Sequence, residues 1–314
     1  MKAAIVQQAG QSPVYGEFEA PIPAAGETPI RVTASAISPV AKSRASGTHY
    51  SARNQFPFVP GIDGVGRRAD GNRVYFVLPR APYGSMAEHT VVPDAQCLPV
   101  PDDLDDVTAA AIANPGLSSW AALTQRAKLR AGETVLINGA TGIAGRLAVQ
   151  IARHLGARKV VATGRNAETL ATLGADVAIP IVADDTALEH RFQQQFAEGV
   201  DVVLDYLWGR SAERLLIAAA KAGPDAVPIR FVQIGAVSGP DITLPSAVLR
   251  SSAVELMGSG IGSIPLDRLV RATSDLLQAT IPGGFEIAVA PVPLEKIEQA
   301  WALNDSSRRT VVTT

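Results

Sequence analysis

The segment TVLINGATGIAGRLAVQIARHLGA, residues 134–157, decides the fold. Its apolar run Val135 to Ile137 predicts a buried strand, and the apolar residues that follow the glycines recur at helical spacing. Three glycines, Gly139, Gly142 and Gly145, separate the two elements. Glycine allows backbone conformations and close approaches that other residues do not. The segment therefore predicts a strand, a glycine-rich turn and a helix that packs closely on the strand.

A glycine-rich turn in this context indicates a dinucleotide site, because the N–H groups and the dipole at a helix N-terminus favour a pyrophosphate. We expect Gly139 to form the tight turn, Gly142 to let the pyrophosphate approach the backbone, and Gly145 to allow the helix to contact the strand. A purely structural turn is the alternative. The predicted cofactor-binding residues around the turn are Gly139, Ala140, Thr141, Gly142, Ile143 and Ala144.

The end of the next strand discriminates between the two nicotinamide cofactors. An NAD site usually places Asp or Glu there to bind the ribose 2′-hydroxyl, whereas a 2′-phosphate needs space and a cation. Here the strand ends in Gly164-Arg165-Asn166, without an acid. Because a guanidinium can bind a phosphate with two hydrogen bonds, we predict NADPH, with these three residues in the site. Arg165 could instead be a solvated residue at the start of a helix.

Strands and helices alternate on both sides of this segment. Apolar runs predict strands at 159–163, 177–180, 200–205, 229–234 and 254–258, with helices at 144–155, 167–173 and 211–222. Short apolar strands covered by helices imply a doubly wound parallel α/β sheet of the Rossmann type. We predict that residues 116–260 form this domain.

The chain outside this region has a different character. Short β-like runs with Pro and Gly between them fill the first 110 residues. Helices are predicted at 107–113 and 117–127, with a domain boundary between them, and at 266–279. We predict that residues 1–115 and 261–314 together form a second, β-rich domain.

Composition narrows the classes of function. The formal net charge of −2 gives no indication of a positively charged surface that would bind nucleic acid or an anionic membrane. No apolar run is long enough for a membrane span, and no secretory signal precedes the first strand. A single cysteine, Cys97, excludes an intrachain disulfide framework and a cysteine-based zinc cluster. These features favour a cytoplasmic protein whose partner is a small molecule.

Several further segments, in order along the chain, resemble one family. They are Phe58 to Gly66 (P-G-x-[DE]-x-x-G), Gly71 to Val74 (G-D-R-V), Tyr83 to Glu88 (G-[GS]-[YF]-A-E), Val202 to Asp205 (V-D-x-V-L-D) and Ile234-Gly235. Together with the glycine turn they resemble the medium-chain dehydrogenase/reductases, and within them the zinc-free quinone oxidoreductase-like and enoyl reductase branch. The resemblance implies that the β-rich domain is a GroES-like catalytic domain and that Gly235 lies near the nicotinamide. It also implies a homodimer, formed through the strand near 253–258.

The resemblance bears on metal binding as well. The zinc-binding branch has a cysteine ligand near Ser38 to Ala41 and a histidine where this chain has Ile62. A third ligand would fall near Asn114. Because a catalytic zinc needs about three protein ligands, we predict no metal.

Without a Lewis acid, direct alcohol oxidation is harder than hydride transfer to a conjugated carbonyl. We therefore predict an NADPH-dependent reductase of quinones or α,β-unsaturated carbonyl compounds. By resemblance, Tyr50 lies near the nicotinamide and could hold a substrate oxygen or donate a proton, although it could equally only pack against the wall of the site. Ser38 is a second candidate catalytic residue. The alternatives are a zinc-free carbonyl reductase or alcohol dehydrogenase, and an NADPH-binding structural or regulatory protein.

Overall fold

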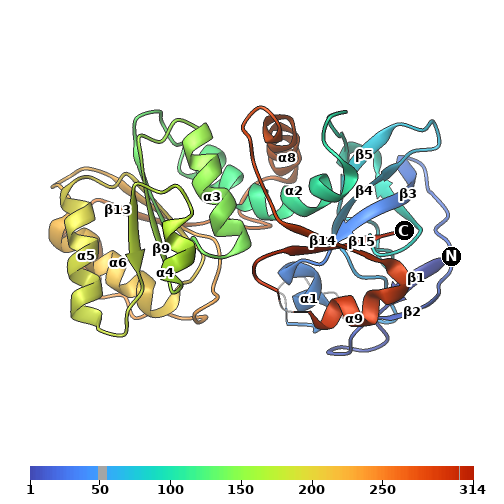
Figure 1. Cartoon of the computed structure of the whole chain (residues 1–314), viewed down its shortest axis with the longest axis horizontal. Coiled ribbons are helices and arrows are strands. Elements are labelled where there is room, and N and C mark those ends of the chain that lie inside the picture. Colours follow the sequence, from blue (N-terminus) through green and yellow to red (C-terminus); the bar gives the residue numbers. More distant parts are fainter. Residues whose placement is uncertain (49–54, 304) are drawn as a thin grey trace. The chain divides into compact units, whose positions relative to one another are not determined.

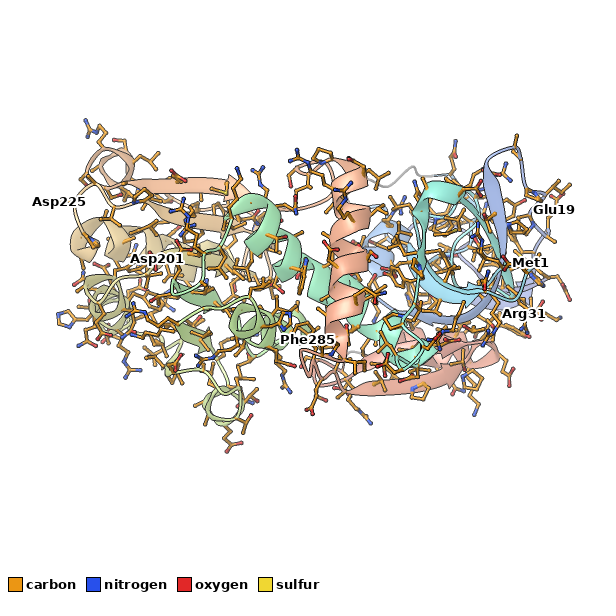
Figure 2. All side chains as sticks on the ribbon, turned by 90° about the horizontal axis from the view of Figure 1, so that it is seen from above. Met1, Glu19, Arg31, Asp201, Asp225 and Phe285 are labelled. Atoms are coloured by element: carbon orange, nitrogen blue, oxygen red, sulfur yellow. The ribbon has the colours of Figure 1, made fainter. Side chains whose placement is uncertain are left out.

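The computed structural model describes residues 1–48, 55–303 and 305–314, in two compact units. Unit 1 comprises Met1–Asn114 and Thr273–Thr314, so that the blue and red ends of the chain fold together, and unit 2 comprises Pro115–Ala272 (Figure 1). In Figure 2, Met1 and Arg31 mark unit 1, and Asp201 marks unit 2. None of the described helices has the length and hydropathy needed to span a bilayer.

Unit 2 contains a parallel sheet in the order β10-β9-β8-β11-β12-β13. The order reverses between β8 and β11, which is the switch point of a doubly wound sheet. The predicted Rossmann-type fold class is therefore confirmed. The strands are β8 (Thr134–Asn138), β9 (Lys159–Gly164), β10 (Val177–Pro180), β11 (Val202–Asp205), β12 (Ile229–Gln233) and β13 (Val254–Gly258), and the helices are α3 (Ile143–His154), α4 (Ala167–Ala171), α5 (Asp185–Ala197), α6 (Gly209–Ala222) and α7 (Ser246–Arg250).

Helix α5 has no counterpart in the prediction, because its exposed face is strongly polar. Two signals mark it in retrospect. The carboxylate of Asp184 accepts hydrogen bonds from the backbone N–H groups of Thr186 and Ala187, 2.9 and 3.2 Å away, and so caps the helix. Leu188 and Phe192 are fully buried one helical turn apart. The helix covers the sheet beside α6, in a core that includes Leu136, Val161, Val203, Leu215 and Phe231.

The predicted gap between two helices at residues 114–116 is wrong, although the two units do divide there, between Asn114 and Pro115. Helix α2 (Asp106–Ala121) runs through Pro115 and continues as a π-helical turn, Ala122–Arg126. A proline inside a helix removes one backbone hydrogen bond, at a cost of about 3 kcal/mol. The run Ala109 to Ala113 is completely buried, and burial together with the high helix propensity of alanine offsets that cost. The division between the units therefore falls inside a helix.

Unit 1 is built on a sheet in the order β14-β15-β3-β4-β5-β7, with β6 also paired to β3, and on the hairpin of β1 and β2. Strand β15 pairs antiparallel with β3, so the last residues of the chain join the sheet to which β3 belongs. The strands are β1 (Lys2–Ile5), β2 (Val14–Glu17), β3 (Glu27–Ala36), β4 (Asp63–Arg67), β5 (Arg73–Val77), β6 (His89–Pro93), β7 (Cys97–Pro99), β14 (Val289–Pro293) and β15 (Arg309–Thr313).

The helices of unit 1 include α1 (Pro39–Ala45), α9 (Ile297–Ala302) and the short 3-10 turns η1 (Asp94–Gln96) and η3 (Leu294–Lys296). Helix α8 (Leu266–Thr280) contains the second division between the units, at Ala272/Thr273. The sequence places that boundary earlier, at 260/261, where the last parallel strand has ended. The structure therefore assigns the first turns of α8 to unit 2.

Candidate cofactor and acceptor sites

The turn after β8 is held against the end of β9. Gly139 has a backbone φ of +97°, a conformation that side chains disfavour. Its N–H donates to the carbonyl oxygen of Thr163 at 3.1 Å, and the N–H of Ala140 donates to the same oxygen at 2.8 Å. The position of the glycine turn is therefore fixed by backbone contacts to the neighbouring strand.

Three glycines near this turn differ in the space that a side chain would have. A Cβ atom at Gly145 would lie 2.3 Å from the carbonyl oxygen of Gly139, and one at Gly164 would lie 2.5 Å from Cγ2 of Thr141. At Gly142, by contrast, the nearest atom to a Cβ would be 3.9 Å away. Gly145 and Gly164 are therefore required for packing within unit 2. The free space at Gly142 is available to a bound group.

The N-terminus of α3 opens at this free space. Gly142 is the N-cap residue, with extended backbone angles and no side-chain cap. The first N–H groups of a helix have no partner within it, and the first turn of α3 contains no acidic residue. Ile143 and Ala144 thus present N–H groups at the positive end of a helix dipole, a donor set suited to a pyrophosphate. The residues present fit the phosphates of a dinucleotide.

Arg165 and Asn166 follow directly on β9. Arg165 is exposed and has no hydrogen-bond or ion-pair partner among the residues that the structure describes. Asn166 caps α4, since its side-chain oxygen accepts a hydrogen bond from the N–H of Thr169 at 2.9 Å. The side chain of Asn166 is therefore engaged in capping α4, whereas the guanidinium of Arg165 is available to a ligand.

A buried hydrogen-bond network lies next to the glycine turn, at the carboxyl ends of the strands. The side-chain amide of Asn138, at the end of β8, donates to a carboxylate oxygen of Asp205 at 2.8 Å and to the hydroxyl of Ser211 at 2.9 Å. Its carbonyl oxygen accepts from the hydroxyl of Thr163 at 2.7 Å. All four side chains are buried. The network joins β8, β9, β11 and α6 at the switch point and fixes the carboxyl ends of these strands.

Asp205 organises the loop after β11. Its Oδ1 also accepts from the N–H groups of Leu207 and Trp208, at 3.0 and 3.1 Å, while Oδ2 is buried without a partner in the described chain. Burial raises the pKa of this carboxyl above its ordinary value, although the hydrogen bonds oppose the shift. Trp208 has φ +57° and ψ −158°, a region that is essentially reserved for glycine. This strained backbone is maintained by the Asp205 carboxylate.

Gly235 lies beside the same loop, after β12. Its N–H donates to the carbonyl oxygen of Asp205 at 3.1 Å, and a Cβ atom at this position would lie 2.7 Å from the carbonyl oxygen of Tyr206. The segments after β11 and β12 are thus in direct backbone contact. All the cofactor-binding residues predicted from sequence belong to unit 2.

The two catalytic candidates belong to unit 1. Ser38 is buried and caps α1, its hydroxyl accepting a hydrogen bond from the N–H of Ala41 at 3.1 Å. Tyr50 lies outside the described residues. A catalytic role for either residue stays a prediction. In the structure, the hydroxyl of Ser38 caps the N-terminus of α1.

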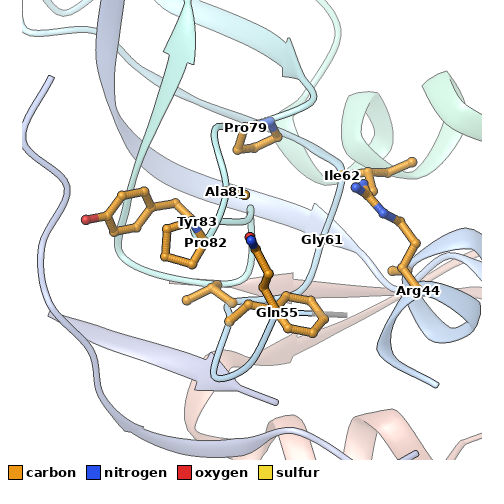
Figure 3. A pocket seen from close by; sticks show the side chains of 11 residues that line it. Arg44, Gln55, Gly61, Ile62, Pro79, Ala81, Pro82 and Tyr83 are labelled. Carbon is orange, nitrogen blue, oxygen red and sulfur yellow. The ribbon is translucent and has the colours of Figure 1, made fainter. Parts of the chain in front are cut away.

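Unit 1 contains a pocket of about 640 Å³, including its opening to solvent. Arg44 from α1 and the amide of Gln55 are the residues with strongly polar side chains in its lining, and Figure 3 shows both among largely apolar neighbours. Ligand pockets typically combine apolar walls with a few polar groups. The lining residues are Ala41, Arg44, Gln55, Phe58, Val59, Gly61, Ile62, Pro79, Ala81, Pro82 and Tyr83.

The segments that correspond to zinc ligands contain few ligating groups. Ile62 is apolar and buried, and among the described residues no three His, Cys, Asp or Glu side chains gather as a metal-holding group. Asp63 is buried, and burial raises the pKa of its carboxyl to about 6 even though hydrogen bonds from Tyr75 and Asn114 and the charge of Arg309 oppose this. Asn114 thus lies beside a carboxyl group in a buried polar cluster.

Sequence reasoning missed Asn138, Asp205 and Arg44 as residues of these sites. Asn138 and Asp205 are the polar residues that end two buried apolar strands, and polar groups at the carboxyl ends of parallel strands converge. That pattern could have found them. Arg44 could not be found in this way, because the pocket forms only when segments far apart in the sequence fold together.

Comparison with known proteins adds independent findings. A family model described as zinc-binding dehydrogenase matches residues 144–279. The chain is 28% identical to the probable NADPH-dependent quinone reductase tdiC of Emericella nidulans over 99% of both chains, and 29% identical to the quinone oxidoreductase of Sus scrofa over 89% of this chain and 85% of that one. A solved quinone oxidoreductase from Thermus thermophilus, studied also as its NADPH complex, superposes over the whole of both chains with a TM-score of 0.82 at 28% identity.

Proposed function

Because the chain belongs to the medium-chain dehydrogenase/reductase superfamily, among relatives named quinone oxidoreductases, we infer that it is an NADPH-dependent quinone oxidoreductase. The observation that carries the choice of NADPH is Arg165, an exposed guanidinium at the end of β9, where no acid is present to bind a 2′-hydroxyl. The free space at Gly142, at the N-terminus of α3, supports the same cofactor through its pyrophosphate.

NADPH, when bound, supplies a hydride. Transfer of that hydride to a quinone, with one proton taken up from a donor or from water, would give a hydroquinone and NADP⁺, so two electrons and two protons are accounted for. The residues of this chain would bind the cofactor and position it. The N-terminus of helix α3 would hold the pyrophosphate and Arg165 the 2′-phosphate. The segments after β11 and β12, fixed by Asp205 and Gly235, would hold the nicotinamide half.

We propose that the acceptor binds in the unit 1 pocket. Apolar side chains such as Phe58 and Ile62 offer a surface for a planar ring, while Arg44 and Gln55 can donate hydrogen bonds to its oxygens. The acceptor class includes quinones and α,β-unsaturated carbonyl compounds. Tyr50 is retained as a proton donor or oxygen-binding group, and Ser38 as a candidate catalytic residue.

The reaction is proposed to need no zinc. Zinc-binding members of the superfamily would place a cysteine ligand in the segment Ser38 to Ala41 and a histidine ligand at Ile62, and this chain has neither a cysteine nor a histidine at these positions. Activity should therefore survive dialysis against a chelator. Loss of activity on chelation, with recovery on addition of zinc, would contradict this part of the proposal.

We further propose a cytoplasmic homodimer. The edge strand β13 leaves one side of its backbone without a strand partner among the described residues, and Leu256 on this strand is 39% exposed. Unpaired edges of this kind tend to pair with another chain. Light scattering coupled to size-exclusion chromatography should give twice the subunit mass of 32.7 kDa, and a single subunit mass would contradict the dimer.

The acceptor class is tested by following NADPH absorbance with a quinone, an enone, an aldehyde and no acceptor. Turnover of the quinone or the enone supports the proposed reductase. Turnover of the aldehyde alone would indicate a zinc-free carbonyl reductase or alcohol dehydrogenase. Tight NADPH binding without turnover of any acceptor would indicate a structural or regulatory protein.

A further inference from the structure

Arg146 lies beside the glycine turn, although the proposed function assigns it no role. It belongs to α3, four residues after Gly142, and its backbone N–H donates to the carbonyl oxygen of Gly142 at 2.9 Å. Residues four apart lie on the same face of a helix, and helical side chains extend toward the helix N-terminus. The side chain of Arg146 therefore extends toward the end of α3 at which the cofactor phosphates are proposed to bind.

One hydrogen bond orients the guanidinium of Arg146. Its Nε–H donates to the backbone carbonyl oxygen of Thr141, in the glycine turn, at 3.0 Å. A guanidinium has five N–H donors, and this bond uses one of them. The side chain is half-buried, and none of the described acidic side chains forms an ion pair with it. The contact with Thr141 therefore fixes the group at the turn without neutralising its positive charge.

Thr141 also connects the turn to the end of β9. A Cβ atom at Gly164 would lie 2.5 Å from Cγ2 and 3.0 Å from Oγ1 of Thr141, so this approach requires a glycine. The carbonyl oxygen of Gly164 accepts a hydrogen bond from the N–H of Ile181 at 2.9 Å, which fixes this end of the strand. Arg165 is the next residue in the chain. Arg146 and Arg165 therefore belong to the same corner of unit 2.

The 2′-phosphate of NADPH carries more negative charge than Arg165 can balance. A phosphate monoester has a charge of about −1.5 to −2 near pH 7, and one guanidinium supplies a single positive charge. A second guanidinium at the same corner would complete the balance. Because Arg146 is half-buried, the lower local dielectric strengthens its attraction for an anion. Because it is already oriented, little side-chain freedom is lost on binding.

We propose that Arg146 is a second specificity-determining residue for NADPH, and that it binds the 2′-phosphate together with Arg165. The inference rests on the proposed function and adds a residue to its cofactor site. The 2′-phosphate is present in NADPH and absent from NADH, so a contact with it affects the binding of one cofactor and not of the other.

Fluorescence titration of the full-length protein with NADPH and with NADH tests the proposal. Arg146→Gln should raise the dissociation constant for NADPH roughly tenfold, since hydrogen bonds to a charged group are lost. It should change the constant for NADH by less than about threefold. An equal rise for both cofactors would place the guanidinium at the pyrophosphate and overturn the proposal, as would an unchanged constant for NADPH.

Two variants control the comparison. Arg158 precedes β9, at the opposite end of the strand, and its Nε–H likewise donates to a backbone carbonyl oxygen, that of Gly132, at 3.2 Å. Arg158→Gln should therefore leave the binding of both cofactors unchanged. Arg146→Lys keeps the charge but loses the planar fork, and its affinity for NADPH should fall between those of wild type and Arg146→Gln. Circular dichroism and thermal unfolding verify that each variant is folded.

A smaller probe separates this inference from the reductase function. Adenosine 2′,5′-bisphosphate contains the 2′-phosphate but no nicotinamide, and adenosine 5′-monophosphate lacks that phosphate. In calorimetric titration the wild-type protein should bind the bisphosphate more tightly, and Arg146→Gln should reduce this preference.

The outcomes of the two kinds of measurement differ. If the preference behaves as expected but no quinone is reduced, the reductase function fails while the role of Arg146 stands. If Arg146→Gln retains the full preference, the role of Arg146 is wrong whatever the activity. A wild-type protein without the preference would contradict both the choice of NADPH and the role of Arg146.

Discussion

A Cβ atom at Gly145, in the first turn of α3, would lie 2.3 Å from the carbonyl oxygen of Gly139, in the turn after β8. Real Cβ atoms do not approach an oxygen this closely, so any side chain at position 145 must push the helix away from the strand. Gly145→Ala is therefore expected to lower the free energy of unfolding by roughly 1–3 kcal/mol, measured by chemical denaturation.

Gly142→Ala is the matched variant for NADPH binding. Gly142 has φ −76°, which alanine adopts freely, and the nearest atom to its Cβ would be 3.9 Å away. The variant should unfold within about 0.5 kcal/mol of wild type. Its dissociation constant for NADPH should nevertheless rise, because the methyl group occupies the space of the pyrophosphate. Unchanged NADPH affinity would place the phosphates elsewhere.

Arg165→Asp tests the assignment of the 2′-phosphate. Fluorescence titration should show the dissociation constant for NADPH rising roughly tenfold to a hundredfold, because an attractive charge becomes a repulsive one. The constant for NADH should change little. Arg191→Asp makes the same change of charge on the exposed face of α5 and serves as control. Equal losses for the two cofactors would contradict the role of Arg165.

Asp63 makes stability depend on pH. Burial raises the pKa of its carboxyl from the ordinary 3.8 to about 6, so the folded state binds a proton that the unfolded state releases between these values. The free energy of unfolding should consequently fall by about 3 kcal/mol as pH rises through this window. Asp63→Asn should remove this component, seen as a flatter stability profile from pH 4 to pH 7 in urea denaturation. An identical slope in both proteins would exclude Asp63 as the source.

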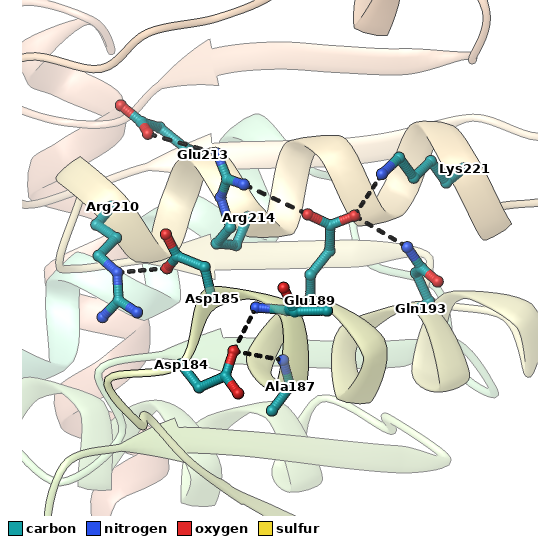
Figure 4. Close-up of polar contacts among 10 residues, drawn as sticks. Asp184, Asp185, Ala187, Glu189, Gln193, Arg210, Glu213, Arg214 and Lys221 are labelled. Carbon is teal, nitrogen blue, oxygen red and sulfur yellow. Dashed lines mark hydrogen bonds and ion pairs between the residues drawn. The ribbon is translucent and has the colours of Figure 1, made fainter.

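The ion pairs between α5 and α6 differ in their expected contribution to stability (Figure 4). Glu189 is 9% exposed and accepts hydrogen bonds from Lys221 and Gln193 at 2.7 and 3.0 Å, with Arg214 at 3.4 Å. Glu189→Gln should therefore destabilise the fold by about 1–2 kcal/mol. Asp185→Asn breaks the exposed pair with Arg210 on the same two helices and should change stability by about 0.5 kcal/mol or less. Equal thermal shifts would contradict the distinction.

Much of unit 2 is predictable because local signals and the global fold agree there. The segment 134–157 combines a buried strand, obligatory glycines and an amphipathic helix, and each of these features has its own physical signature in the sequence. Pro115 is the opposite case. Its local preference for ending a helix is overridden by burial of the alanine run before it, and tertiary packing of that kind cannot be read from propensity.

The cofactor side of the site could be located from sequence better than the acceptor side. The backbone cradle depends on glycines at fixed spacing, which the sequence displays directly. The acceptor pocket depends on Arg44 meeting loops near residues 59–62 and 79–83, and this meeting is set by sheet pairing. Ser38 shows the same limit, since its hydroxyl starts a helix, a role that its resemblance to a catalytic segment did not suggest.

The central claim, NADPH-dependent reduction of a quinone by this chain, is tested most directly by measuring kcat/KM for one quinone with NADPH and with NADH. The measurement uses protein dialysed against a chelator, with oxidation of the cofactor followed by absorbance. Quinone-dependent oxidation with kcat/KM at least about tenfold higher for NADPH is expected, because Arg165 binds only the phosphorylated cofactor. No quinone-dependent oxidation, or a preference for NADH, would contradict the account.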